Sequence, residues 1–173
     1  MISSMSSSAL LVIDVQNGVV LHAWQREAVV ERINLAIVSA RSAGIPVIWV
    51  QHSEEEMPID SDFWQIIPEL VPQPEDARID KIHGSSFKET DLAEILEVEN
   101  VGHLYITGSQ SENCVNATTV DALERGFRVT LISDAHTTDD ESAVATINEK
   151  FLQMAGSHAD LRVELLEKTL PLS

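Results

Sequence analysis

Cysteine is nearly absent from this chain of 173 residues, which contains one, Cys114. A lone cysteine cannot form an internal disulfide, so the composition requires no oxidising compartment, and we expect a cytoplasmic protein. Basic residues are also scarce, with 11 Lys and Arg against 28 Asp and Glu and a net charge of -17. This excess of negative charge repels nucleic acids and anionic membrane surfaces. We therefore expect neither as a partner.

Long apolar runs are missing as well. No stretch approaches the roughly 20 apolar residues that a membrane-spanning helix needs. Residues 1–8 lack the basic start and apolar middle of a signal peptide, and we interpret them as a disordered tail. The remaining length suits one hydrophobic core, so we predict a single domain over residues 9–173.

What the sequence does contain is an alternation of short β-branched runs with segments of helical pattern. This alternation predicts a parallel sheet covered by helices. We expect an α/β fold, a three-layer α/β/α sandwich with a mostly parallel, Rossmann-like sheet of about six strands. The predicted strands are residues 9–15, 45–50, 77–82, 103–107, 127–132 and 161–165.

Two segments interrupt the alternation. Residues 51–74 hold four of the six prolines and predict an elaborated loop with a short helix. The acidic run over residues 54–56 within it is typical of a solvated surface. Residues 133–140 also predict a polar loop, and residues 141–155 have the composition of a helix.

Cys114 follows the predicted strand over residues 103–107, where a turn leads into a helix. Ser111 is a candidate N-cap, which would place Cys114 in the first helical turn, where the helix dipole favours a thiolate. A buried structural cysteine is the alternative interpretation. The nucleophile is favoured because Asp14 and Lys81 also lie at the ends of predicted strands, at the edge where α/β enzymes place their active sites.

These three residue types match the needs of amide hydrolysis by a thiol. Asp14 can act as the base and later the acid, Lys81 can keep Asp14 ionised, and backbone N–H groups near Cys114 can hold an oxyanion. Histidines are alternative partners for the thiol, and no H-x-x-x-H spacing indicates a metal site, so we expect neither metal nor cofactor. The histidines in or near predicted loops are His52, His83, His103 and His136.

Four ordered motifs resemble the isochorismatase-like cysteine hydrolases, a family that includes nicotinamidases, N-carbamoylsarcosine amidases and ureidoacrylate hydrolases. The resemblance extends from Ala9 to about Leu165. The motifs are Leu11–Asn17, Phe63–Leu70, Lys81–Phe87 and Thr107–Val115.

The resemblance implies a catalytic triad of Asp14, Lys81 and Cys114. It also implies a cis peptide between Ser109 and Gln110, with the N–H groups of Gln110 and Cys114 forming the oxyanion hole. The implied activity is hydrolysis of an amide or carbamoyl C–N bond of a small molecule through a thioester, by a homo-oligomer, either a dimer or a tetramer. Candidate substrate-binding residues are Val19, His52, Trp64 and Phe87.

Other functions stay open at this point. Nicotinamidases resemble one another in an Asp-x-His metal site that is replaced here by Val50-Gln51-His52, and isochorismatases, which cleave a vinyl ether, typically lack the cysteine. A phosphatase of the haloacid dehalogenase type shares the Asp14 strand motif, but Gln16 stands where that chemistry needs an acid. A catalytically silent binding or scaffold protein of the same fold is the remaining alternative.

Overall fold

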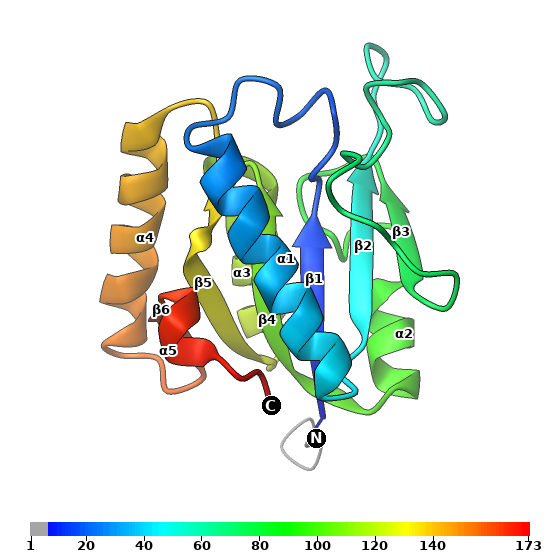
Figure 1. Cartoon of the computed structure of the whole chain (residues 1–173). Coiled ribbons are helices and arrows are strands. Elements are labelled where there is room, and N and C mark those ends of the chain that lie inside the picture. The colour runs from blue at the N-terminus through cyan, green and yellow to red at the C-terminus, as the bar shows by residue number, and fades with distance from the viewer. Residues whose placement is uncertain (1–6) are drawn as a thin grey trace.

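The computed structural model describes residues 7–173 and contains a six-stranded sheet in which all neighbouring strands are parallel (Figure 1). The strand order is β3-β2-β1-β4-β5-β6, with β1 and β4 in the centre. The predicted α/β fold with a parallel sheet is confirmed. The strands are β1 (Ser7–Ile13), β2 (Val47–His52), β3 (Ala77–Lys81), β4 (Val101–Ser109), β5 (Arg128–Thr137) and β6 (Leu161–Glu164).

Helices cover both faces of this sheet and complete the three layers (Figure 1). Helices α1 and α5 pack on one face, and α2, α3 and α4 pack on the other. Among residues 7–173, none of the helices has both the length and the apolar character needed to cross a membrane. The helices are α1 (Arg26–Ser42), α2 (Leu92–Val98), α3 (Asn116–Glu124), α4 (Glu141–Ala155) and α5 (Leu166–Thr169).

Strand β1 shows how the sequence builds these layers. Successive side chains of a strand point to opposite faces of the sheet. Leu11 accordingly packs in a buried cluster with Phe151 of α4, whereas Leu10 packs in a second cluster with Ile33 of α1. Because both faces are covered, β1 is apolar at every position from Ala9 to Ile13, as is typical of a central parallel strand.

The structure corrects the boundaries of two predicted segments. Strand β1 begins at Ser7, so the predicted tail over residues 1–8 is too long, and its first six residues lie outside the described part of the chain. Strand β5 continues to Thr137, so the first five residues of the predicted loop 133–140 are strand. These residues are mostly polar, so the sequence pattern did not indicate a strand. The strand pairs again with β4 after a register shift between Ile106 and Gly108.

The predicted short helix within residues 51–74 is also wrong. This segment contains turns and isolated bridges instead. Its backbone carbonyls bind the loop after β1: the Asn17 N–H donates to Gln65 O, and the Gly18 N–H donates to Phe63 O, each over 2.9 Å. Hydrogen bonds to another segment therefore replace the local bonds of a helix, and they hold residues 63–65 above the carboxyl end of β1.

Candidate active site

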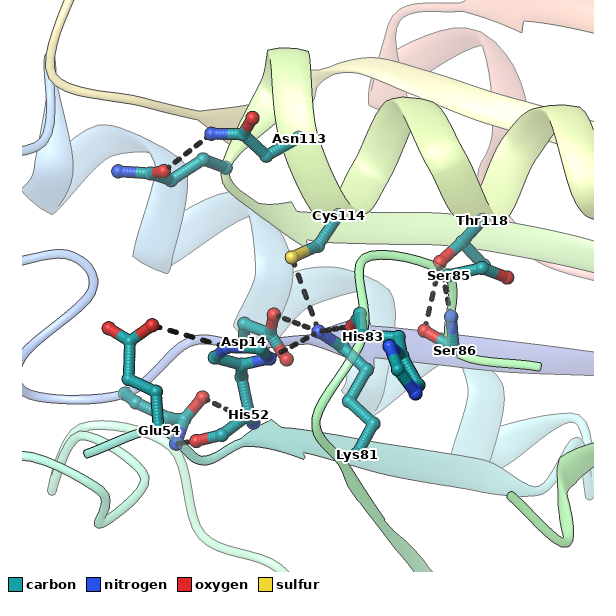
Figure 2. Close-up of polar contacts among 12 residues, drawn as sticks. Asp14, His52, Glu54, Lys81, His83, Ser85, Ser86, Asn113, Cys114 and Thr118 are labelled. Atoms are coloured by element: carbon teal, nitrogen blue, oxygen red, sulfur yellow. Dashed lines mark hydrogen bonds and ion pairs between the residues drawn. The ribbon is translucent and has the colours of Figure 1, made fainter. Parts of the chain in front are cut away.

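The three predicted catalytic residues meet at the carboxyl ends of the strands (Figure 2). Asp14 follows β1, Lys81 is the last residue of β3, and Cys114 lies between β4 and α3. The chain crosses from β1 to β2 on one side, while β4 lies on the other side of β1. Such a reversal of strand order is where open α/β sheets place their ligands.

Lys81 joins the other two residues. Its ammonium Nζ lies 2.8 Å from Asp14 Oδ2 and 3.2 Å from Cys114 Sγ. The Lys81 and Asp14 side chains are 0% and 2% exposed, so the ion pair is shielded from water. The Lys81 ammonium also contacts the His83 carbonyl oxygen at 3.0 Å and His52 Nδ1 at 3.1 Å. Since an ammonium can only donate, His52 accepts through Nδ1.

Asp14 occupies an unusual backbone conformation. Its φ of 51° lies in the left-handed region, which few residues other than glycine adopt. The Asp14 N–H still donates to the Val50 carbonyl at 2.9 Å, so the residue remains attached to β2. The chain turns here, and the carboxylate lies against Lys81 below Cys114. Asp14 Oδ1 is buried and has no hydrogen-bond partner within residues 7–173.

Burial controls protonation in this site. It raises the pKa of Asp14 above its ordinary value, although the Lys81 charge acts in the opposite direction. Burial, together with the negative charge of Asp14, raises the pKa of the Cys114 thiol to about 12, and the lowering effect of Lys81 is smaller. The expectation that a helix terminus and Lys81 would favour a resting thiolate is therefore wrong. The raised pKa favours the thiol over the thiolate, so a base has to take the proton as the sulfur attacks.

The segment that carries Cys114 differs from the predicted capped helix. Residues Ser111–Val115 form a single π-helical turn before α3, and Ser111 makes no N-cap hydrogen bond. Ser111 Oγ instead lies 2.7 Å from Nδ1 of the buried His136, whose Nε2 lies 2.8 Å from Asn148 Oδ1. The peptide between Ser109 and Gln110 is cis, as the resemblance implies. The Cys114 turn is thus attached to β5 and α4 through side chains.

A cavity of about 460 Å³ opens above Cys114. Val19 and His52, two of the predicted substrate-binding residues, line it. The cavity is lined by Asp14, Gly18, Val19, His52, Glu54, Glu56, Met57, Phe63, Gln110, Asn113 and Cys114.

The other two predicted substrate-binding residues, Trp64 and Phe87, do not line this cavity. Phe87 is 4% exposed and stacks on Phe127 in the core, at 5.7 Å between ring centroids. Trp64 is also buried, and its carbonyl oxygen accepts hydrogen bonds from the side chains of Gln16 and Gln51. Both rings therefore pack inside the protein, and the prediction that they bind substrate is wrong for this cavity.

Sequence reasoning missed the residues at the cavity mouth. Phe63 is 54% exposed and lines the cavity in place of its neighbour Trp64. Glu54 and Glu56 are exposed, as predicted for a solvated run, but they also line the cavity, whereas Glu55 does not. The only signal in the sequence was their position soon after β2, because loops at that edge surround the site.

The histidines are not direct partners of the thiol: within residues 7–173, no imidazole is hydrogen-bonded to Cys114 Sγ. His52 contacts Lys81, and His83 faces Glu89. His103 lies at the start of β4, far from the carboxyl ends, and His136 supports Ser111. In the described part of the chain, no group of three or more His, Cys, Asp or Glu side chains is placed to hold a metal ion.

Comparison with known proteins shows which family this chain resembles. The isochorismatase domain family matches residues 8–160. A streptothricin hydrolase of Streptomyces noursei is 33% identical over 147 residues, covering 82% of this chain and 53% of that protein. The chain therefore spans about half the length of this relative. A probable inactive nicotinamidase of Arabidopsis thaliana is 30% identical over 156 residues, covering 75% of this chain and 80% of that protein.

Solved structures show the same fold. An isochorismatase family protein superimposes with a TM-score of 0.82 and 32% identity, covering 92% of this chain and 98% of its own. The N-carbamoylsarcosine amidase of Thermoplasma acidophilum superimposes with a TM-score of 0.80 at 23% identity, covering 94% and 98% of the two chains. The resemblance found in the sequence motifs is confirmed along nearly the whole chain.

Proposed function

Because this chain belongs to the isochorismatase family of hydrolases, we propose that it hydrolyses an amide or carbamoyl C–N bond of a small molecule, with Cys114 as the nucleophile. The observation that carries the proposal is the contact of Cys114 Sγ with Lys81, itself paired with Asp14, at the base of an open cavity. A nucleophile, an acid/base and a positive charge on neighbouring atoms are the parts that covalent hydrolysis needs.

In the first half-reaction, the Asp14 carboxylate takes the thiol proton as Sγ attacks the carbonyl carbon. The high pKa of Cys114 suits this order, since the proton leaves only when the base receives it. The carbonyl oxygen becomes an oxyanion, held by the N–H groups of Gln110 and Cys114. Asp14 then passes its proton to the leaving nitrogen, and ammonia or an amine departs from the thioester.

In the second half-reaction, Asp14 removes a proton from water, whose oxygen attacks the thioester carbonyl. The C–S bond breaks, the sulfur regains its proton from Asp14, and a carboxylic acid leaves. The Lys81 ammonium, 2.8 Å from Asp14 Oδ2, stabilises the ionised carboxylate. No step requires a metal or a cofactor.

The test is a panel of small amides, ureas and carbamoyl compounds, together with streptothricin, screened for release of ammonia or amine. Intact-protein mass should show an acyl group on Cys114 during turnover. Cys114→Ala should release nothing and gain no mass, while its circular dichroism and melting temperature stay close to those of the parent protein.

Two outcomes would contradict this proposal, and each would favour a different function. Hydrolysis that persists in Cys114→Ala would exclude the covalent route and favour vinyl ether or other non-covalent chemistry on the same fold. A complete lack of turnover, together with no acyl adduct, would favour the silent binding protein, a possibility supported by the probable inactive relative. The isochorismatase match gives no support to the haloacid dehalogenase alternative.

A further inference from the structure

The mouth of the catalytic cavity carries only negative charge. Among the described residues that line it, Asp14, Glu54 and Glu56 are acidic, and none is Lys or Arg. Lys81 lies behind Asp14, its side chain fully buried, where its charge is already paired. The negative charge that Lys81 does not neutralise therefore lies at the rim, on Glu54 and Glu56.

The rim carboxylates are placed by a tight turn. The Glu54 N–H donates to the Met57 carbonyl at 3.2 Å, and the Met57 N–H donates to the Glu54 carbonyl at 3.0 Å. This pairing puts Glu55 and Glu56 at the tip, and the buried Met57 holds the turn against the protein. Glu54 and Glu56 line the cavity, while Glu55 between them does not. The turn thus places alternate glutamates in the lining of the cavity.

These carboxylates have no cationic side chain as a partner within residues 7–173. Glu54 Oε2 lies 3.6 Å from His52 Nε2 (Figure 2). His52 already accepts a hydrogen bond from Lys81 at Nδ1, which keeps the proton of a neutral imidazole on Nε2. Glu56 takes part in none of the ion pairs of the described residues. The charge at the rim is therefore free to act on a ligand.

A further residue suits a positively charged ligand. Phe63 is 54% exposed and lines the cavity, and an aromatic face attracts ammonium and guanidinium groups. Met57, whose side chain is buried, also lines the cavity and adds apolar surface beside this ring. The cavity thus combines two carboxylates and an exposed aromatic residue in one lining, with no Lys or Arg among the described lining residues.

We infer that the cavity selects substrates that carry an ammonium or guanidinium group at the end remote from the bond that is cleaved, with Glu54, Glu56 and Phe63 as specificity-determining residues. The inference rests on the proposed hydrolysis and adds the class of substrate. The cationic end would lie between the rim carboxylates and Phe63 while the carbonyl approaches Cys114. An isosteric neutral amide would lose this attraction but could still reach the sulfur.

The experiment compares matched pairs of amides that differ only in a terminal ammonium or an equally long terminal methyl group. The parent protein should show the higher kcat/KM for the ammonium member, and added salt should reduce the difference. Glu54→Gln and Glu56→Gln should each lower the ratio of the two kcat/KM values about two- to five-fold, which is the range expected for an exposed ion pair. The change should appear in KM. Glu55→Gln is the control and should leave the preference unchanged.

Binding provides a readout that does not depend on turnover. Calorimetry on Cys114→Ala should give a lower Kd for the ammonium member than for the methyl member, and Glu56→Gln in that background should remove part of the difference. Equal kcat/KM and equal Kd for both members would overturn the inference, as would an identical loss in Glu55→Gln, which would indicate a general effect of surface charge. If hydrolysis fails altogether while the difference in Kd persists, the proposed reaction is wrong and the cation site stands.

Discussion

Gly108 of β4 lies against Ile13 of β1 so closely that a Cβ at residue 108 would be 2.1 Å from the Ile13 carbonyl oxygen. The φ of Gly108 is 125°, a conformation that side chains rarely allow. Asp14 directly follows Ile13, and β4 leads to Cys114. This contact between backbones therefore brings the carboxylate and the sulfur to the same cavity.

Gly108→Ala should damage both stability and catalysis. Backbone strain and overpacking each cost about 1–3 kcal/mol, so the free energy of unfolding should fall by roughly 2–6 kcal/mol. Urea unfolding measures this loss. Gly44→Ala is the matched control, because Gly44 also has a positive φ, of 71°, but nothing lies within 4 Å of its added Cβ. Equal losses in the two variants would show that strain alone, and not the contact with Ile13, explains the result.

Asp14→Asn tests the acid/base. Asparagine tolerates a positive φ, so the backbone should remain in place. The loss of a positioned acid/base should lower kcat/KM by about 10²–10⁴-fold. Removing one partner of a buried ion pair also leaves Lys81 uncompensated, which should cost about 3–5 kcal/mol of stability.

The double variant Asp14→Asn, Lys81→Met separates the two effects. It removes both buried charges, so the free energy of unfolding should recover relative to Asp14→Asn while activity stays low. Near-normal kcat/KM in Asp14→Asn at neutral pH would show that a different group removes the thiol proton.

The raised pKa of Cys114 predicts its reactivity. With a pKa of about 12, the thiolate fraction and the rate of iodoacetamide alkylation should increase about tenfold for each pH unit from 7 to 10, without a plateau. A free cysteine peptide levels off near its pKa of about 8.5. Asp14→Asn removes a negative charge that raises the pKa, so its rate should level off at a lower pH. Fast alkylation of the parent protein that is independent of pH near 7 would contradict this prediction.

The lowered pKa of His103 predicts a loss of stability in acid. Burial, reinforced by Arg128 and Arg162, lowers the pKa of His103 to about 4. The neutral imidazole is favoured in the folded protein, whereas the unfolded chain binds a proton near pH 6.5. The contribution of His103 to the free energy of unfolding is therefore present above pH 6.5. It is lost as the pH falls towards 4, by up to about 1.4 kcal/mol for each pH unit.

Urea unfolding at several pH values measures how steeply the free energy of unfolding changes with pH. His103→Gln should reduce it, and His22→Gln, which changes an exposed histidine, should not. The pH dependence that remains in His103→Gln should come in part from His136. This histidine is also buried, and burial lowers its pKa. An NMR titration that places His103 near 6.5 in the folded protein would contradict the prediction.

Local patterns predicted much of this fold. The continuous apolar run of β1 and the helical repeat of α1 are properties of neighbouring residues, so they are visible without any tertiary information. Strand ends also identified Asp14, Lys81 and Cys114, since parallel strands place their carboxyl ends on one edge. The predicted dimer or tetramer stays a prediction.

Other features depended on packing between distant segments. No local pattern distinguishes Phe63, which lines the cavity, from Trp64, which packs inward, because hydrogen bonds between residues 16–18 and 52–65 set their positions. Likewise, the alternate placement of Glu54 and Glu56 follows from a turn that closes on Met57.

The sequence by itself determined which elements form, and which chemical groups stand at their ends, because hydrophobic periodicity acts over a few residues. Only the tertiary structure decided how those groups behave. Lys81 reaches Asp14 from the far side of β2, and the pKa of Cys114 is raised because the folded chain removes water around it and places a carboxylate beside it. Strand order and desolvation are properties of the whole packed chain, and no short stretch of residues encodes either one.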